Sequence, residues 1–337
     1  MKRFEHGGQI ELFAKELNCD VKDIIDLSSN INFIKPDINI DFNKLDISSY
    51  PVYDKLYEAI SRNYNISVNQ LELFNGGSSA IFSLFKHLKL KHCTIYAPAY
   101  LEYKKACKNF SLELEFVNRL NNIYDEIKDN TFVIFVNPAT PDGTYYDMDR
   151  LMNYWISKNA TILIDESFLD FCNKDSCIHF LNSYDKLYIL KSMTKFYSSA
   201  SIRVGSIISN KHNIEKLRLK EPMWKISHFD SIYLQEALKD KSFKKLSCVI
   251  NAKNKAILEQ ILKNSKYVKS IYESSGNYIL VKLQKTDAPT LQKKLKAYKI
   301  MIRDCANFDF LDNTYVRFAV KSEKQLKVLQ QALTSIS

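Results

Sequence analysis

Short apolar runs that alternate with helical patterns constrain the fold of this chain more than any other feature. Three of these runs cover residues 131–136, 160–164 and 187–190, and a helix is predicted between the first two over residues 148–158. Strands that are apolar on both faces are typical of a parallel sheet that helices cover on both sides. The sequence therefore predicts an α/β fold with a mostly parallel sheet.

Chemically reactive side chains stand just beyond these predicted strands. Asn137 and Asp165 directly follow the first two apolar runs, and Lys195 lies shortly after the third. The carboxyl ends of parallel strands meet at one edge of a sheet, where ligands of open α/β sheets bind. The sequence therefore predicts that Asn137, Asp165 and Lys195 meet in one site.

Lys195 has two hydroxyl residues before it, Ser192 and Thr194, and Arg203 eight residues after it. A lysine at a strand end beside small hydroxyl residues is placed to form a Schiff base with an aldehyde. The hydroxyls and the guanidinium suit a phosphate group, so we predict that Lys195 carries pyridoxal phosphate (PLP). The Ser-x-x-Lys spacing also fits the nucleophile motif of penicillin-binding proteins, but their Lys-Thr-Gly and Ser-Asp-Asn motifs are absent from the sequence.

Two glycine-containing stretches suit a ligand but have ordinary explanations as well. Residues 75–79, Asn-Gly-Gly-Ser-Ser, precede a helix predicted over residues 80–90. Backbone N–H groups at such a helix start favour an anion, although a simple N-cap fits the same residues. His6-Gly7-Gly8 fits either a backbone that closely approaches a ligand or a flexible arm.

The composition bounds the class of protein. Hydrophobic residues make up 46% of the chain and charged residues 26%, values typical of a soluble globular protein. No apolar run approaches the length of a membrane span, and no signal-peptide core follows the start. We therefore expect a cytoplasmic enzyme without a membrane partner.

Charge and cysteine usage narrow the partners further. The formal net charge of +10 suits anionic ligands, and because no recognised nucleic-acid motif accompanies the scattered lysines, we expect no nucleic-acid partner. The seven cysteines lack Cys-x-x-Cys spacing, which argues against a disulfide framework and a zinc site. We predict no metal site.

The pattern changes after about residue 223. A long helical region over residues 231–263, with a break near residues 241–242, precedes strand and helix candidates that alternate to near the end of the chain. This order indicates a smaller α+β domain. We predict an N-terminal arm over residues 1–45 that belongs partly to the small domain, a large cofactor-binding domain over residues 46–230, and a C-terminal small domain over residues 231–337.

The motifs also resemble a known family when they are taken in order. Gly-Gly-Ser-Ser, Pro-x-Tyr, Asn-Pro-x-x-Pro-x-Gly, Asp-Glu, Ser-x-x-Lys and a following arginine span Gly76 to Arg203. This order resembles the fold-type I PLP enzymes of the aspartate aminotransferase superfamily. Within that group the chain looks like the branch that holds histidinol-phosphate aminotransferase and threonine-phosphate decarboxylase. The resemblance implies a fold-type I architecture with a large and a small domain.

The resemblance also implies roles for individual residues. Asp165 would face the pyridine nitrogen, Asn137 would donate to the phenolic oxygen, and Tyr100 would stack on the ring. Tyr50 matches a residue that reaches the cofactor phosphate of the partner subunit, which implies a homodimer. The residues implied to hold the phosphate within one subunit are Gly77, Ser78, Ser79, Ser192 and Arg203.

Other motifs are similar to those of the decarboxylases in this branch: His6-Gly7-Gly8, Ser29-Asn30-Ile31-Asn32, and Ile302-Arg303-Asp304-Cys305. The aminotransferases usually have a tyrosine where this chain has Phe168. Arg317 matches the arginine that binds the substrate carboxylate. We expect the substrate to be anchored by His6, Asn32, Arg303 and Arg317.

We therefore predict a decarboxylase that takes a small anionic substrate, phosphoserine or phosphothreonine, and yields CO2 and an amino-alcohol phosphate. For phosphoserine the product would be ethanolamine phosphate, and the one missing methyl group alters selectivity by only about 1–3 kcal/mol. The alternatives are a histidinol-phosphate-type aminotransferase and a PLP-binding protein without catalysis.

Overall fold

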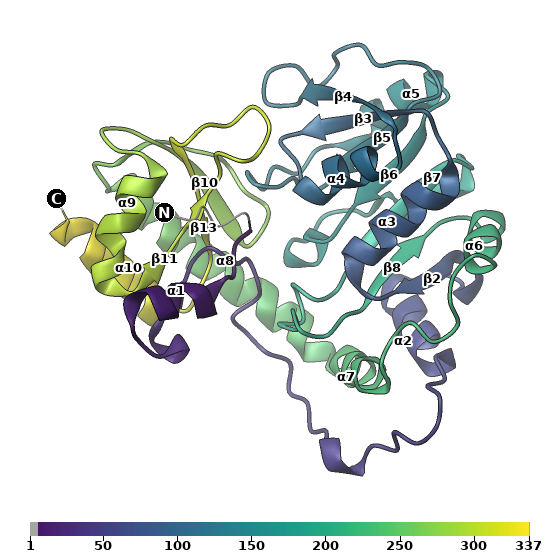
Figure 1. Cartoon of the computed structure of the whole chain (residues 1–337), viewed down its shortest axis with the longest axis horizontal. Coiled ribbons are helices and arrows are strands. Elements are labelled where there is room, and N and C mark those ends of the chain that lie inside the picture. The colour runs from purple at the N-terminus through teal and green to yellow at the C-terminus, as the bar shows by residue number, and fades with distance from the viewer. Residues whose placement is uncertain (1–5, 337) are drawn as a thin grey trace.

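A seven-stranded sheet forms the centre of the larger of two lobes in the computed structural model, which describes residues 6–336 (Figure 1). The strands lie in the order β2-β8-β7-β6-β5-β3-β4. Neighbours from β7 to β4 run parallel, whereas β8 is antiparallel to both of its neighbours. The strands are β2 (Leu71–Phe74), β3 (His92–Ala97), β4 (Glu113–Asn118), β5 (Phe132–Val136), β6 (Thr161–Asp165), β7 (Leu187–Ser192) and β8 (Gly205–Ile208).

Helices cover both faces of this sheet because its central strands are apolar on both sides. In β5, Val133 and Phe135 pack into one core cluster, and Ile134 and Val136 pack into the other. The first cluster lies under α2 (Asp54–Tyr64), α5 (Met148–Ser157) and α7 (His228–Lys239). The second lies under α3 (Gly76–Leu88), α4 (Leu101–Asn109) and α6 (Lys211–Arg218). The predicted mostly parallel α/β sheet is therefore confirmed.

The smaller lobe is built on an antiparallel sheet with the strand order β12-β13-β10-β9. Its core cluster joins this sheet to three helices through side chains such as Leu258, Leu291 and Leu329. The elements are α8 (Lys241–Lys263), β9 (Val268–Ile271), β10 (Tyr278–Leu283), α9 (Ala288–Leu295), β12 (Arg303–Asp304), β13 (Tyr315–Ala319) and α10 (Glu323–Ser335).

The N-terminal segment joins the smaller lobe before the chain enters the larger one. After α1 (Ile10–Leu17), β1 (Ile25–Asp26) pairs in parallel with β11 (Ile300–Met301). The backbone N–H of Asn32 then donates to the carbonyl oxygen of Lys195 at 3.0 Å. The chain next runs as an extended loop around the outside of the molecule to α2 (Figure 1).

Short 3-10 helices complete the described chain. They are η1 (Val21–Asp23), η2 (Phe42–Lys44), η3 (Val68–Gln70), η4 (Leu169–Phe171), η5 (Cys177–Asn182) and η6 (Lys296–Tyr298). Within residues 6–336, no helix is both long and apolar enough to cross a membrane.

Of three local predictions, two differ from the structure and one is confirmed. The helix predicted from residue 80 already begins at Gly76, whose φ of +79° a glycine adopts readily. The break predicted near residues 241–242 is confirmed, because α7 ends at Lys239 and the Asp240 side chain accepts hydrogen bonds from the first N–H groups of α8. The strand predicted over residues 300–303 is divided at Ile302, whose N–H donates to Gln292 instead of a neighbouring strand.

Candidate active site

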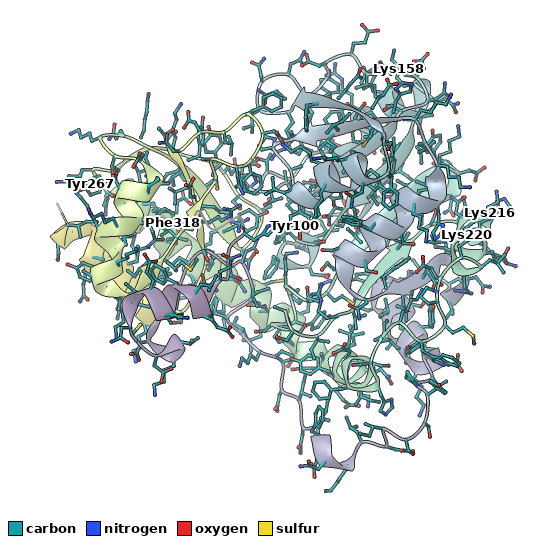
Figure 2. The ribbon with its side chains drawn as sticks, viewed as in Figure 1. Tyr100, Lys158, Lys216, Lys220, Tyr267 and Phe318 are labelled. Carbon is teal, nitrogen blue, oxygen red and sulfur yellow. The ribbon has the colours of Figure 1, made fainter. Side chains whose placement is uncertain are left out.

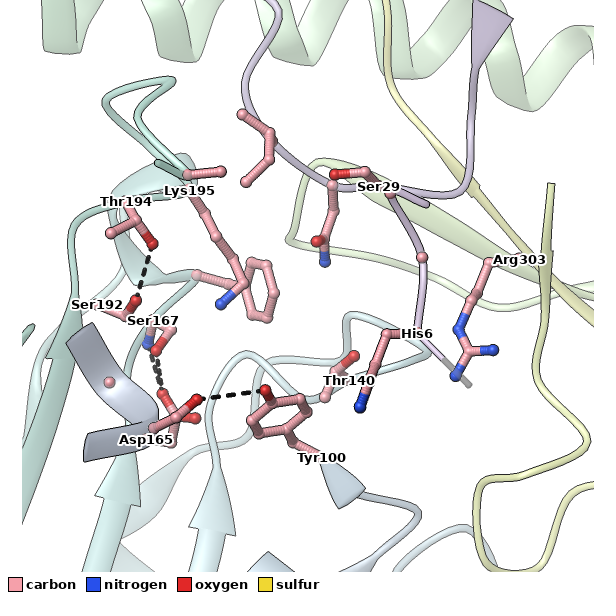
Figure 3. Close-up of a pocket in the computed structure, with 18 of the residues that line it drawn as sticks. His6, Ser29, Tyr100, Thr140, Asp165, Ser167, Ser192, Thr194, Lys195 and Arg303 are labelled. Carbon is pink, nitrogen blue, oxygen red and sulfur yellow. Dashed lines mark hydrogen bonds between the residues drawn. The ribbon is translucent and has the colours of Figure 1, made fainter. Parts of the chain in front are cut away.

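A cavity of about 430 Å³ lies between the two lobes, at the carboxyl ends of β6 and β7. Both lobes and the N-terminal segment line it, and Tyr100 marks its place near the centre of the molecule (Figure 2). Lys195 points into the space between Asp165 and Tyr100 on one side and His6 and Arg303 on the other (Figure 3). The volume suits a small-molecule site.

Lys195 follows β7 and reaches the cavity from the sheet edge. Its Nζ lies 5.0 Å from the centre of the Phe168 ring. Burial lowers the pKa of Lys195, and the nearby charges of Arg317 and Arg203 add to this effect, while Asp165 opposes it. A lowered pKa favours the neutral amine, which is the nucleophilic form.

Asp165 is the last residue of β6 and is buried at the wall of the cavity. Its Oδ1 accepts hydrogen bonds from the backbone N–H of Ser167 at 2.9 Å and from the Ser167 hydroxyl. Its Oδ2 accepts a hydrogen bond from the Tyr103 hydroxyl at 2.6 Å. This carboxylate is therefore held in one orientation at the cavity.

A cradle for an anion lies where the start of α3 meets the residues that follow β7. A side chain on Gly76 would collide with the Arg203 guanidinium, and one on Gly77 would lie 3.3 Å from Ser192. Ser192 Oγ lies 3.2 Å from the Thr194 hydroxyl. Backbone N–H groups at a helix start, hydroxyls and a guanidinium together fit a phosphate.

Tyr100 lines the cavity beside the start of α3. It is the N-cap residue of α4, and its hydroxyl lies 3.4 Å from Ser78 Oγ. Burial raises the pKa of Tyr100, so the phenol stays neutral. Its position at the cavity suits a ring that stacks on a planar cofactor.

Two buried arginines face each other on the smaller lobe. Arg303 of β12 pairs in register with Arg317 of β13, and both line the cavity. Arg317 donates to Thr140 Oγ1 at 3.2 Å and to the carbonyl oxygen of Ser28 at 3.1 Å. Burial lowers the pKa of Arg303 to about 10, which still leaves it charged at neutral pH. Neighbouring buried cations create a strong site for anions.

The N-terminal segment closes one side of the cavity. A side chain on Gly7 would collide with the backbone of Ser28, so the two chain segments lie in close contact. The backbone N–H of Gly8 donates to Ser28 Oγ at 2.9 Å. His6 lies 3.7 Å from the carboxylate of Glu102, at the edge of the cavity.

Four residues predicted for the site do not line this cavity: Tyr50, Ser79, Asn137 and Asn32. Tyr50 is 71% exposed and stacks on Trp224, with ring centres 4.1 Å apart. Ser79 is exposed on α3, next to the cradle. Asn137 exchanges two hydrogen bonds with the backbone of Tyr146.

Asn32 departs furthest from its predicted place among the substrate anchors. Its side-chain amide donates to the carbonyl oxygen of Phe196 at 2.9 Å and to Ser247 Oγ at 2.6 Å. Its Oδ1 accepts a hydrogen bond from Asn251. Asn32 therefore connects the N-terminal segment to α8 and to the loop after β7 that contains Lys195. Asn30 and Ile31, and not Asn32, line the cavity.

Sequence reasoning missed several residues at the site. Tyr103 and Ser167 hold Asp165, while Thr140 and Phe308 line the cavity. The Asp-x-Ser spacing of 165 and 167 is a known side-chain turn pattern and was a usable signal. Tyr103 had no such signal, because its contact depends on how α4 packs against β6.

Comparisons with known proteins identify the family. Residues 24–333 match the family model for aminotransferases of class I and II. This chain belongs to that family. Pyridoxal phosphate is its cofactor, and the fold-type I architecture predicted from the motif order is confirmed.

Relatives with two different names match the chain at similar identity. A threonine-phosphate decarboxylase from Salmonella typhimurium is 25% identical, over 98% of this chain and 97% of the relative. A histidinol-phosphate aminotransferase from Methanocaldococcus jannaschii is 24% identical, over 99% and 96%. An adenosylcobalamin biosynthesis bifunctional protein CobDQ from Leptospira interrogans is 26% identical over 98% of this chain, which spans only 41% of that protein.

Solved structures agree on the fold. The histidinol-phosphate aminotransferase from Clostridium acetobutylicum has a TM-score of 0.84 at 27% identity, covering 93% of this chain and 99% of that chain. The enzyme of the same name from Sinorhizobium meliloti, in complex with pyridoxal-5'-phosphate, has a TM-score of 0.81 at 15% identity, covering 100% and 98%.

The residues at the cavity fit this cofactor. The cradle of Gly77, Ser192 and Arg203 suits the phosphate, and the buried carboxylate of Asp165 suits a protonated ring nitrogen. Lys195 would supply the amine that holds the aldehyde carbon. Bound there, PLP supplies an electron-withdrawing ring for bond cleavage at the α-carbon of an amino substrate.

Proposed function

We propose that this chain is a PLP-dependent decarboxylase of an O-phosphorylated amino acid, phosphoserine or phosphothreonine. The products are CO2 and an amino-alcohol phosphate. The supporting observation is the buried pair Arg303 and Arg317, in register across β12 and β13 at the cavity. It stands in addition to Arg203, which serves the cofactor phosphate. A phosphoamino acid carries a carboxylate and a phosphate, so its two anions match the two extra guanidinium groups.

The anchoring of the substrate decides which bond breaks. Only a bond perpendicular to the cofactor ring overlaps the ring's π system, so residues that orient the substrate select the reaction. Arg303 and Arg317 hold the two anionic groups and turn the α-carboxylate to that position. Lys195 lines the cavity, and its protonated form would supply the proton that the α-carbon needs once CO2 has left.

Phe168 supports the same proposal. Its ring lies beside Lys195 Nζ and is 4% exposed. A phenylalanine supplies no hydroxyl to the phenolic oxygen of the cofactor, unlike the tyrosine usual in the aminotransferases that this chain resembles.

The second candidate is a histidinol-phosphate-type aminotransferase. The observation in its favour is the relative of that name, which matches at nearly the same identity as the decarboxylase. Histidinol phosphate carries a phosphate but no carboxylate, so it matches one of the two arginines, whereas the 2-oxoglutarate that such an enzyme also binds would match both through its two carboxylates.

The test supplies phosphoserine, phosphothreonine and histidinol phosphate separately to the PLP-loaded enzyme, with 2-oxoglutarate present. We expect CO2 from a phosphoamino acid and no keto product. Arg303→Gln should lower kcat/KM for the phosphoamino acid about 10- to 100-fold, because a hydrogen bond to a charged group contributes roughly 1.5–3 kcal/mol. The control is Arg150→Gln, since Arg150 is exposed and contacts the Tyr124 ring away from the cavity. Transamination of histidinol phosphate without any CO2 would overturn the proposal.

We also propose that the chain acts as a homodimer in which Tyr50 reaches the partner's cofactor. Exposed apolar side chains surround Tyr50, with Val52 at 71%, Met223 at 73% and Trp224 at 52% exposure. A group of exposed apolar residues of this kind marks an interaction surface.

We also propose that the protein is located in the cytoplasm, and cell fractionation tests this location.

A further inference from the structure

Tyr103 makes a contact that the roles described so far do not use. Its side chain is completely buried on α4, and its hydroxyl donates to Asp165 Oδ2 at 2.6 Å. Tyr103 lies within the first turn of the helix that Tyr100 caps, and the two rings meet edge to face with centres 6.1 Å apart. The same helix start therefore carries one side chain at the cofactor ring and another that contacts the carboxylate.

The hydrogen bonds leave Asp165 little freedom. A carboxylate offers about four acceptor positions on its two oxygens. Ser167 occupies two positions on Oδ1 through its N–H and its hydroxyl, and Tyr103 occupies one on Oδ2. The remaining position on Oδ2 is available for the cofactor, because Asp165 lines the cavity.

Tyr103 remains a donor throughout the working pH range. Burial raises the pKa of Tyr103 well above its ordinary value, and the negative charge of Asp165 raises it further. The phenol is therefore neutral, and its proton points at the carboxylate. A donor on one oxygen stabilises the charged form of the carboxyl group and weakens its affinity for another proton.

We propose that Tyr103 is a positioning residue that aims Asp165 at the ring nitrogen of PLP and keeps the shared proton on that nitrogen. The inference rests on the cofactor and not on the proposed decarboxylation, so it holds equally for an aminotransferase. Without the Tyr103 hydroxyl, Asp165 takes a larger share of the proton, and the ring loses positive charge.

In the PLP-loaded enzyme, the charge on the ring affects the pKa of the Lys195 nitrogen. The charged groups that act on this nitrogen are Asp165, Arg317 and Arg203. The Tyr103 hydroxyl contacts one of these three groups, Asp165. A less positive ring repels a proton on the Lys195 nitrogen less, so removing the hydroxyl raises the pH at which that proton is lost.

Tyr103→Phe removes the hydroxyl and keeps the ring. In the PLP-loaded variant, the pH midpoint of the visible absorbance should move upward by about half to one unit, a shift equivalent to roughly 0.7–1.4 kcal/mol. The dissociation constant of PLP, measured by fluorescence titration, should rise severalfold. Neither readout requires turnover, so a failure of the proposed decarboxylation leaves this test intact.

The matched control is Tyr96→Phe. Tyr96 is 1% exposed, and its hydroxyl accepts a hydrogen bond from Trp155 Nε1 at 2.7 Å, outside the cavity. This variant loses one buried hydrogen bond and should melt at a lower temperature while it keeps the wild-type absorbance midpoint. If Tyr103→Phe also melts lower but keeps the wild-type midpoint and PLP affinity, Tyr103 is structural and the inference is wrong.

Ser167→Ala provides a second variant should Tyr103→Phe fail to fold. It removes the hydroxyl donor on Oδ1 and retains the Ser167 N–H donor. Its absorbance midpoint should move in the same direction by a smaller amount. An unchanged midpoint in folded, PLP-loaded Ser167→Ala contradicts the idea that donors on Asp165 set the charge of the ring.

Discussion

Burial has different consequences for the cations at the two ends of the cavity. It lowers the pKa of Arg303 to about 10, so the guanidinium remains charged at neutral pH and can bind an anion. It also lowers the pKa of Lys195, and for an amine this favours the neutral, nucleophilic form. Burial therefore has a different result for each residue, because the ordinary pKa of arginine is higher than that of lysine. Arg303 keeps its charge, whereas the neutral form of Lys195 becomes more favourable.

The lowered pKa of Lys195 predicts a pH dependence of stability in the protein without cofactor. The unfolded chain binds a proton at this lysine up to its ordinary pKa of 10.5, and the folded chain releases it at lower pH. Because the unfolded state binds more protons in that window, the free energy of unfolding rises with pH, by at most about 1.4 kcal/mol per unit.

Lys195→Met should abolish this contribution. Urea unfolding between pH 7 and pH 10 should show wild-type protein gaining stability relative to the variant as pH rises. Lys216→Met is the control, because Lys216 is exposed on α6 and should leave the slope unchanged. A constant difference between wild type and Lys195→Met across this range would contradict the lowered pKa.

The ordered motifs found most of the residues that meet at the cavity, from Gly77 and Tyr100 to Arg203. Their proposed roles remain predictions. The motif could not separate Asn32 from Asn30, because the contacts of Asn32 with Ser247 and Asn251 depend on where α8 packs. Local sequence contains no record of such distant partners.

At the scale of elements, one buried ion pair joins the loops that carry the site. Arg119, just beyond β4, donates to Asp142 at 3.0 Å in the loop after β5. It also donates to the carbonyl oxygens of Pro98 at 2.9 Å and Thr140 at 3.1 Å. The Arg119 and Asp142 side chains are 1% and 0% exposed. The loops that carry Tyr100 and Thr140 are therefore fixed to one guanidinium.

Asp142→Asn should destabilise the protein by about 3–5 kcal/mol, because it leaves a buried guanidinium without its counter-charge. The control is Asp129→Asn in the exposed pair with Lys158, where the side chains are 69% and 24% exposed and the expected cost is about 0–1 kcal/mol. Urea unfolding of both variants measures the difference. Equal effects of the two substitutions would show that Arg119 does not join these loops.

Elements were easier to predict than their connections. The apolar runs of β5, β6 and β7 were found because full burial of both faces leaves a continuous apolar pattern in the sequence. Arg119 was missed because a lone arginine after a strand looks like a surface charge until the loops around it are placed. The short α6 was missed as well, since only Ile214 and Leu217 are buried in it.

At the scale of the whole molecule, the exposed stack of Tyr50 on Trp224 fits the proposed homodimer, in which a second copy completes the site. The hybrid-dimer experiment follows from this arrangement. Tyr50→Ala and Lys195→Ala should each lower activity as homodimers, whereas co-expression should restore about a quarter of wild-type activity. Random pairing makes half of the dimers hybrids, and each hybrid has one intact site.

The control co-expresses Lys195→Ala with Asp165→Asn. Both residues line the cavity of one chain, so no hybrid contains a cavity with both residues intact and activity should not return. Recovery in this control, or a monomer in analytical ultracentrifugation of the wild-type protein, would contradict the shared site.

The pairing of β1 with β11 also orders events during synthesis. Asp26 pairs with Met301, and this pairing holds the N-terminal segment beside the smaller lobe. A few residues later, the backbone N–H of Asn32 donates to the carbonyl oxygen of Lys195. At about 5–20 residues per second, the ribosome needs roughly 15–55 s to add the partner strand after β1 has been made. Once β8 has been made, the larger lobe can form around its own sheet, while β1 remains unpaired until β11 follows. The active site is therefore assembled last, and a chain that stops before residue 300 cannot complete it.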